Sequence, residues 1–216
     1  MTQRIRGISD EEAVGPAKDL FEASNKMLGR TANLMRILSH SPYVARWILP
    51  FIAAVRQPNA GAVSDVRLRN LAVLKTSTIN DCHYRTEHNY VLGQALGLKD
   101  EEFDALKGDY QASPLFNARE KATIAWSEAM TLNTAKRDNK VWDAMRREFN
   151  DAEIVEISLA CSMFNMINRL NDSFRTELES VEYNRRQHGA VGVTRATLEE
   201  YACRICTEQS GAAKSA

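Results

Sequence analysis

Apolar residues recur along most of the chain every three or four positions, which is the spacing of helices that bury one face. Runs that alternate apolar and polar residues, as strands do, are missing. We therefore expect an all-helical fold. The expected helices cover residues 9–27, begin at 31 and at 42, pass through 67–74, run from 82 to a C-cap at 97, and cover 100–106, 117–130, 138–149, 150–182 and 197–206.

The helix expected at residues 150–182 is apolar nearly all round, so it should be central and buried. Polar residues at spacings of three or four form one stripe along it: Ser158, Ser162, Asn165, Arg169 and Asp172. A buried polar stripe must find hydrogen-bond partners. We interpret it either as the wall of a ligand pocket, with Asn165 and Arg169 as binding residues, or as a hydrogen-bonded seam between helices or subunits.

Charge and apolar runs argue against several classes of protein. The 28 basic and 28 acidic residues cancel, so nothing points to nucleic acid or to an anionic membrane as a partner. The longest apolar run, residues 47–55, contains Pro50 and is far shorter than the roughly 20 residues of a membrane span. The N-terminus lacks the apolar core of a signal peptide, so a cytoplasmic protein is expected.

Residues 80–89 are the strongest candidate for a chemical site. This segment holds two of the four histidines and one of the four cysteines, together with a tyrosine and an arginine. We expect Cys82 in the first turn of a helix, with Asn80 or Asp81 as the N-cap. The positive end of the helix dipole favours a thiolate there. The alternative is a cysteine that packs in the core beside solvated histidine and arginine side chains.

No metal site is expected from the sequence. Asp81, His83, Glu87 and His88 include neighbours at i+1 and i+2, which face different ways on a helix, so they cannot all converge on one ion. The cysteines should be reduced in the cytoplasm. Their uneven spacing, at positions 82, 161, 203 and 206, matches neither a disulfide framework nor a zinc site.

Residues 28–42, 80–89 and 165–169 together give the chain a family resemblance. They are similar, in the same order, to segments of the carboxymuconolactone decarboxylase family, which includes the alkylhydroperoxidase D-like proteins. The likeness spans roughly residues 10–180. It implies an alkylhydroperoxidase D-like helical bundle that assembles into trimers or hexamers. It also implies an active site beside the helix that begins in residues 80–89.

The resemblance suggests how the chain divides. We expect residues 1–183 to form the carboxymuconolactone decarboxylase-like domain and residues 184–216 to form a C-terminal extension. The extension has a basic, glycine-containing stretch and then a short helix that ends at Cys206. From Thr207 on, the residues are those typical of a disordered tail.

The redox members of the family carry Cys-x-x-Cys-x-x-x-His in this helix and a glutamate one helix earlier. In this chain the first cysteine corresponds to Cys82, but the second falls on Arg85, the histidine on Asn89 and the glutamate on Asn70. In those members the second cysteine attacks the peroxide, and the glutamate and histidine remove its proton, so a dithiol cycle is not expected here. The decarboxylase-like members lack the cysteine pair and tend to have an acidic residue and a histidine. This chain has a histidine, His88, one position before the place of the redox members' histidine.

We interpret the chain as a decarboxylase-like, cofactor-independent lyase or isomerase of a small carboxylated or phenolic ring compound, a role in aromatic compound catabolism. His83 or His88 supplies the base, since histidine ionises nearest neutral pH. Tyr84 would donate a hydrogen bond to a developing oxyanion, and Arg85 would hold a carboxylate. Cys82 either acts as a nucleophile or packs. The remaining candidate substrate-binding residues are Asn70, Asn89, Asn165 and Arg169.

Two alternatives stay open. One is a thiol redox protein that uses Cys82 with Cys203 and Cys206, although a Cys-x-x-Cys in a thin C-terminal helix usually serves packing. The other is a catalytically silent protein that keeps the fold for binding or assembly, because a fold does not fix a function.

The altered motif predicts negligible alkylhydroperoxide reductase activity, because Arg85, Asn89 and Asn70 stand where the attacking thiol and its proton relay would be. The check is turnover of an organic hydroperoxide with a dithiol reductant. Robust dithiol-dependent turnover that Cys82→Ser abolishes would contradict the prediction.

Overall fold

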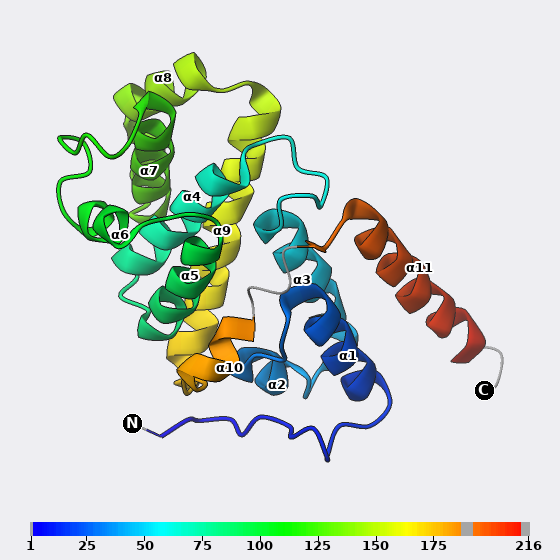
Figure 1. Cartoon of the computed structure of the whole chain (residues 1–216). Coiled ribbons are helices and arrows are strands. Elements are labelled where there is room, and N and C mark those ends of the chain that lie inside the picture. Colours follow the sequence, from blue (N-terminus) through cyan, green and yellow to red (C-terminus); the bar gives the residue numbers. More distant parts are fainter. Residues whose placement is uncertain (1, 187–191, 213–216) are drawn as a thin grey trace. The chain divides into compact units, whose positions relative to one another are not determined.

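The computed structural model describes residues 2–186 and 192–212, and at residues 83, 85–87, 181 and 208–212 it describes the backbone alone. Apart from an isolated β-bridge between Asn59 and Thr194, these residues form helices and loops, so the all-helical prediction is confirmed (Figure 1). None of the described helices is long and apolar enough to cross a membrane. The helices are α1 (Pro16–Leu28), α2 (Asn33–Leu38), α3 (Pro42–Arg56), α4 (Val66–Ile79), α5 (His83–Ala95), α6 (Asp100–Lys107), α7 (Ala118–Thr131), the 3₁₀ turn η1 (Ala135–Arg137), α8 (Asn139–Glu148), α9 (Asp151–Phe174), α10 (Val181–Arg185) and α11 (Arg195–Ala212).

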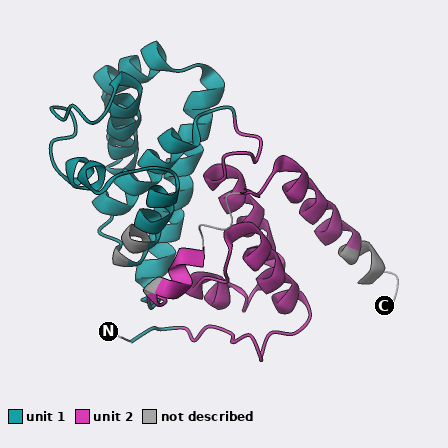
Figure 2. Cartoon of the chain, in the orientation of Figure 1, with its two compact units in different colours: residues 1–4, 63–177 teal, residues 5–62, 178–216 magenta. Residues whose placement is uncertain are grey.

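The chain forms two compact units (Figure 2). Unit 1 comprises residues 1–4 and 63–177, and unit 2 comprises residues 5–62 and 178–216. The C-terminal helix α11 packs against α3, so the C-terminal segment shares a unit with residues 5–62. The expected division into residues 1–183 and a C-terminal extension, residues 184–216, stays a prediction.

Helix α4 is the centre of unit 1. Every residue from 68 to 77 is buried, and the helix packs against α5, α7 and α9. Part of its surface joins an apolar core composed of Leu71, Leu74, Leu98, Phe103, Leu106, Tyr110, Phe116 and Ile124. The polar side chains of a helix enclosed in this way must find hydrogen-bond partners within the protein, because water does not reach them.

Helix α9 is less buried than its sequence predicts. Val155, Leu159 and Met166 are exposed by 55%, 43% and 41%, so the expectation of a central helix buried all round is wrong. The polar stripe is also not buried. Ser162, Arg169 and Asp172 are exposed, whereas the half-buried Ser158 and Asn165 form hydrogen bonds with Trp126 and Thr131 on α7.

Local hydrogen bonds set several helix ends where the sequence placed them. Asn117 with Glu120 and Asn150 with Glu153 form reciprocal capping boxes at the starts of α7 and α9.

Helix α9 ends at Phe174 rather than near residue 182, because Arg175 adopts a left-handed conformation (φ 53°) that stops the helix.

The first helix starts later than predicted. Ser9 and Glu12 do exchange the hydrogen bonds of a capping box, at 3.0 and 3.3 Å, but they close only a turn. Gly15 then takes a positive φ of 51°, and Pro16 occupies the first position of α1, where its missing N–H costs nothing.

A buried lysine ties α4 to its neighbours. The Lys75 ammonium donates to the carbonyl oxygen of Leu106 at 3.3 Å, lies 3.4 Å from the Glu128 carboxylate and sits 4.6 Å from the centroid of the Tyr110 ring. The Tyr110 hydroxyl donates to Glu128 at 2.6 Å. Burial, followed by this hydrogen bond, raises the pKa of Tyr110 above its ordinary value, so the hydroxyl keeps its proton.

Unit 2 is built on α1, α3 and α11. Helix α3 packs on the other two, and the buried Arg30 and Glu179 form an ion pair at 3.6 Å beside the turn between α1 and α2. Helix α11 continues through Ala212, so the expectation of disorder from Thr207 is wrong as far as residue 212. The remainder of the predicted tail, residues 213–216, lies outside the described residues.

The exposed apolar stripe of α9 predicts a homo-oligomer, for which the family resemblance implies a trimer or hexamer. Large apolar side chains in a row along one helix are typical of a surface that a partner covers. Leu159→Glu should therefore reduce the mass measured by light scattering at micromolar concentration. Val14→Glu, at an exposed position of unit 2, is the control and should leave the mass unchanged. A wild-type protein that is already a stable monomer would refute the prediction.

Candidate active site at the start of helix α5

The connection between α4 and α5 is a tight reversal made by three residues. Asn80 caps the C-terminus of α4, Asp81 adopts a left-handed conformation (φ 51°), and Cys82 is the N-cap of α5. The expected N-cap, Asn80 or Asp81, is therefore one or two residues too early. Aspartate is among the few residues other than glycine that accept a positive φ readily, which lets the chain turn without a longer loop.

Cys82 lies in the core of unit 1. Its side chain is completely buried, and its Sγ lies 3.9 Å from the carbonyl oxygen of Asn168 on α9, which can accept the thiol proton. The Cys82 backbone N–H donates to the carbonyl oxygen of Ser77 on α4 at 3.2 Å. The cysteine thus stands at the N-terminal, electropositive end of α5 in a place that water does not reach.

Ser77 connects the three helices around this cysteine. Its hydroxyl donates to the carbonyl oxygen of Val73 at 2.9 Å and accepts from Asn89 Nδ2 on α5 at 2.9 Å. The amide nitrogen of Asn168 on α9 lies 3.4 Å from the same oxygen. Ser77, Asn89 and Asn168 are completely buried. Their hydrogen bonds therefore hold the start of α5 against α4 and α9.

His88 and Tyr84 lie one turn apart on α5, and both are buried. Their ring centroids are 4.1 Å apart at an interplanar angle of 50°, so the tyrosine ring holds one side of the imidazole. Together with Cys82 and Asn89, these residues place four chemically versatile side chains in the interior on one helix.

Three further predicted site residues are Asn70, His83 and Arg85, and the structure describes only the first of their side chains. Asn70 is buried on α4, two turns before Ser77. The side chains of His83 and Arg85 lie outside the described part of the structure, so their roles stay predictions.

Asn165 and Arg169 belong to a second polar cluster on α9. Asn165 accepts from Asn80 Nδ2 at 3.0 Å and donates to the Thr131 hydroxyl at 3.2 Å. The exposed guanidinium of Arg169 donates to the Asn165 side-chain and main-chain oxygens at 3.1 and 3.0 Å. Of the two interpretations of the polar stripe, these hydrogen bonds agree with a seam between helices.

Cys161 lies beneath that seam. Its Sγ is 3.2 Å from the Thr76 hydroxyl and 3.5 Å from Asn165 Nδ2, and the thiol is completely buried. Burial raises the pKa of the Cys161 thiol, although the hydrogen bonds from these neighbours oppose the shift. A thiol that stays protonated in the core is a poor nucleophile.

Sequence reasoning missed Ser77, Asn168 and Cys161 as parts of these clusters. Asn168 falls inside the segment 165–169 that carries the family resemblance, so that segment was one signal for it. For Ser77 the signal was weaker: three hydroxyl residues in a row, at 76–78, follow the apolar stretch of α4. Thr76 and Ser77 are completely buried, so these two hydroxyls do not belong to a solvent-exposed face of the helix.

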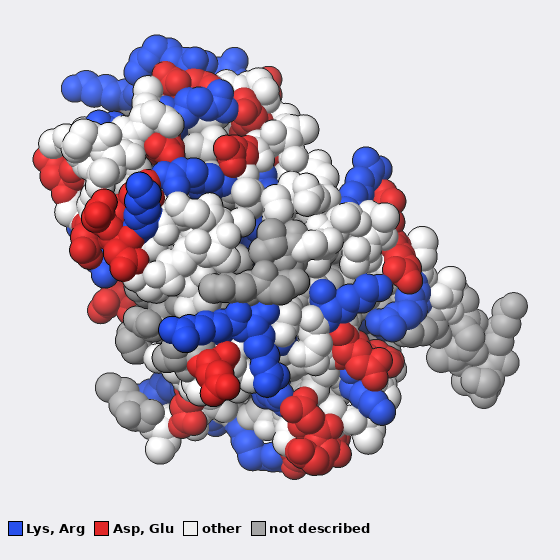
Figure 3. Space-filling model, viewed as in Figure 1, with Lys and Arg blue, Asp and Glu red and all other residues white. Residues whose placement is uncertain are grey.

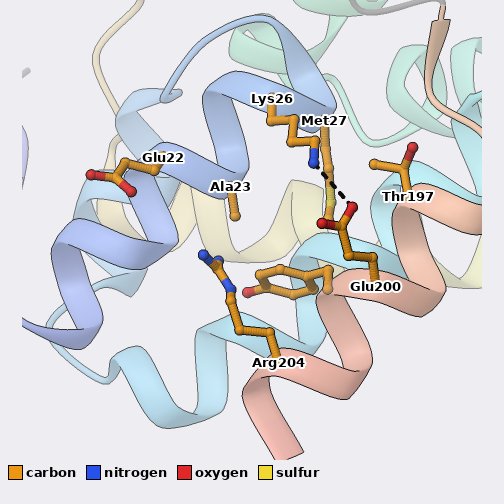
Figure 4. Close-up of a pocket in the computed structure, with 8 residues that line it drawn as sticks. Glu22, Ala23, Lys26, Met27, Thr197, Glu200 and Arg204 are labelled. Carbon is orange, nitrogen blue, oxygen red and sulfur yellow. Dashed lines mark hydrogen bonds and ion pairs between the residues drawn. The ribbon is translucent and has the colours of Figure 1, made fainter. Parts of the chain in front are cut away.

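Other surfaces offer less chemistry. In unit 2 a groove of about 200 Å³ lies between α1 and α11, and the ion pair of Lys26 and Glu200 at 3.2 Å spans it (Figure 4). On the face drawn in Figure 3, basic and acidic side chains are interspersed, in line with the net charge of zero. Among the described residues, no group of three or more histidine, cysteine or acidic side chains could hold a metal ion.

Comparison with known proteins identifies the fold. No family model matches the chain, and no curated protein matches it in sequence. Among solved structures, the debrominase Bmp8 covers 93% of this chain and 99% of its own, with a TM-score of 0.69 at 17% identity. Its complex with 2,3,4-tribromopyrrole, crystallised as a cysteine-to-alanine variant, gives a TM-score of 0.70.

A peroxidase-related protein from Ralstonia eutropha, described as an alkylhydroperoxidase AhpD core, has a TM-score of 0.70 at 16% identity and covers 85% of this chain and 96% of its own. A peroxidase-related protein from Silicibacter has a TM-score of 0.68 at 18% identity, over 85% of this chain and 97% of its own. The protein therefore has the alkylhydroperoxidase D-like helical fold that the sequence resemblance predicted.

The hydrogen bonds of Ser77 predict a measurable cost when its hydroxyl is lost. Ser77→Ala leaves the buried Asn89 and Asn168 amides short of an acceptor, so the free energy of unfolding should fall by about 1–3 kcal/mol. Urea unfolding measures it. Ser127→Ala is the matched control, because that buried hydroxyl donates to Thr123 on its own helix and should cost less. Equal losses in the two variants would contradict the role assigned to Ser77.

Proposed function

We propose that the protein is a cofactor-independent lyase or isomerase that acts on a small carboxylated or phenolic ring compound by proton transfer, with His88 as the base. The observation that carries this proposal is the complete burial of Cys82, His88 and Asn89 together on α5, beside the nearly buried Tyr84. Burying polar side chains costs stability, and proteins accept that cost most often at functional sites.

The proposed base is held in one orientation. The Tyr84 ring lies tilted against the imidazole of His88, and the surrounding core keeps bulk water away from both. Histidine ordinarily ionises near neutral pH, so it can accept a proton from a carbon next to a carbonyl group and return it elsewhere. Shielding from water strengthens every electrostatic interaction that such a proton transfer uses.

The other residues are assigned supporting roles. Tyr84, four residues before His88, is on the same side of α5, so its hydroxyl is suited to donate to an oxyanion that forms as His88 takes the proton. Arg85 is proposed to bind the carboxylate of the substrate, an assignment that rests on the sequence alone. The Asn89 side chain already donates a hydrogen bond to Ser77, so Asn89 is better described as a positioning residue than as a substrate ligand.

The solved structures with the same fold support the class of substrate. The debrominase Bmp8 was crystallised with 2,3,4-tribromopyrrole, a small ring compound, and it covers nearly the whole of this chain. Identity of 17% relates the folds alone, so the ring compound enters here as support for the size and shape of the ligand rather than for the reaction.

The experiment has two stages. A thermal shift screen of aromatic acids, phenols and lactones first selects compounds that raise the unfolding midpoint, because only ligands of the native state do so. Selected compounds are then incubated with the protein in D₂O, and NMR follows loss of carboxylate or entry of deuterium at the carbon next to the carbonyl or enol group.

His88→Gln should lower kcat/KM by roughly 10²–10⁴-fold, the usual contribution of a general base, with KM little changed. The control is His40→Gln, which replaces a histidine of unit 2 that contacts the Arg6 carbonyl oxygen. If neither deuterium exchange nor decarboxylation occurs with any stabilising compound, or if His88→Gln retains full activity, the proposal is wrong.

A second candidate is thiol-dependent reductive removal of a halogen from a ring. The position of Cys82 at the N-terminal end of α5, in a fold shared with a debrominase, favours it. The Cys82 thiolate would take the halogen, the ring carbon would keep the electron pair and gain a proton, and an added dithiol would then release halide and become a disulfide. Halide release that requires the dithiol, and that Cys82→Ala but not Cys161→Ala abolishes, would select this candidate.

A further inference from the structure

We propose that Cys203 and Cys206 form a surface dithiol site that reacts with low-molecular-weight disulfides and closes to an intramolecular disulfide. The site is separate from the proposed active site: it lies on α11 in unit 2, whereas Cys82 and Cys161 lie in the core of unit 1. It therefore does not depend on the reaction proposed above.

Accessibility distinguishes this pair from the other thiols. Cys203 and Cys206 are both exposed, and they are three residues apart on one helix, so they project from adjacent turns of the same side. The side chains of Cys82 and Cys161 are completely buried, and burial also raises the pKa of the Cys161 thiol. A dissolved disulfide can thus reach the α11 pair without opening the core.

Closing a disulfide requires the turn to deform. Side chains at i and i+3 have Cβ atoms about 5–6 Å apart in a regular helix, whereas a disulfide brings them to about 3.5–4.5 Å. The Thr207 hydroxyl lies within hydrogen-bond distance of two carbonyl oxygens of this turn, those of Cys203 at 3.1 Å and Arg204 at 2.9 Å, and can donate its single proton to either one. Such side-chain bonding competes with the backbone hydrogen bonds of the helix, and it can keep a donor on one of the two carbonyl groups while the backbone shifts.

The reaction is an ordinary exchange of thiols and disulfides. The Cys203 thiolate attacks one sulfur of the small disulfide, which forms a mixed disulfide and releases the first small thiolate. The Cys206 thiolate then attacks the Cys203 sulfur, forming the protein disulfide and releasing the second small thiolate. The two protons of the cysteines end on the two released thiols. The protein loses two electrons, and the small disulfide gains them.

Closure also changes a wall of the groove in unit 2. Arg204 lies between the two cysteines in sequence and lines the groove, as do Glu200 and Tyr201 on the preceding turn (Figure 4). The Arg204 guanidinium sits 5.5 Å from the centroid of the Tyr201 ring. Tightening the turn at 203–206 moves the backbone that carries this arginine. A disulfide that strains its helix and is exposed to solvent is easily reduced, so the change should be reversible.

The sequence provides a direct readout. Trypsin cleaves after Arg204, between the two cysteines, and so separates residues 196–204 from residues 205–214. The full-length reduced protein is incubated with oxidised glutathione, remaining thiols are blocked with N-ethylmaleimide, and the tryptic digest is examined by mass spectrometry without reduction. We expect the two fragments joined by a disulfide that dithiothreitol cleaves, and Cys82 and Cys161 modified only after unfolding.

Single variants test the order of steps. Cys206→Ser should stop at a glutathione adduct on Cys203, because the second attack is no longer possible. The proposal is overturned if the wild-type protein retains glutathione on Cys203 without closing or if Cys206→Ser gains no adduct. It is also overturned if Cys82 is modified first in the folded protein, or if a non-reducing gel shows that the joined fragments come from two chains.

Discussion

The arrangement of unit 1 depends on the enclosure of α4. Because every residue from 68 to 77 is buried, each polar side chain on this helix has to find its hydrogen-bond partners within the protein. Ser77 does this at the point where the chain turns into α5: its carbonyl oxygen accepts the Cys82 N–H, and its hydroxyl accepts the Asn89 amide. The position of the candidate site is thus set by the two oxygen atoms of one buried serine, together with the left-handed turn at Asp81.

One of the residues in these hydrogen bonds is also where this chain departs from the dithiol pattern of the redox proteins it resembles. Asn89 stands where those proteins have their relay histidine. Its side chain does not titrate, and its amide nitrogen donates a hydrogen bond to the Ser77 hydroxyl. The imidazole one position earlier, His88, is buried against Tyr84 instead. Because the cysteine lacks its partner and the histidine lies elsewhere on the same helix, we propose proton transfer or single-thiol chemistry rather than a dithiol cycle.

Local signals in the sequence predicted those features that local hydrogen bonds decide. The boxes at Asn117 and Asn150 act over three residues, so the starts of α7 and α9 were predictable, as was the all-helical fold. The exposed side of α9 was not, because periodicity cannot tell whether an apolar face such as that of Leu159 is covered by the same chain. The role of Ser77 was also out of reach, because its amide partners are 12 and 91 residues away.

The proposed function requires a ring compound to bind beside the buried His88, and NMR of histidine-labelled protein tests this binding directly. The imidazole signals are assigned with His88→Gln and His40→Gln, and 4-hydroxybenzoate, which carries both a carboxylate and a phenol, is then titrated in. The account predicts that the His88 signals move saturably while those of His40, in unit 2, stay in place. Unchanged His88 signals at ligand concentrations that raise the unfolding midpoint would contradict it.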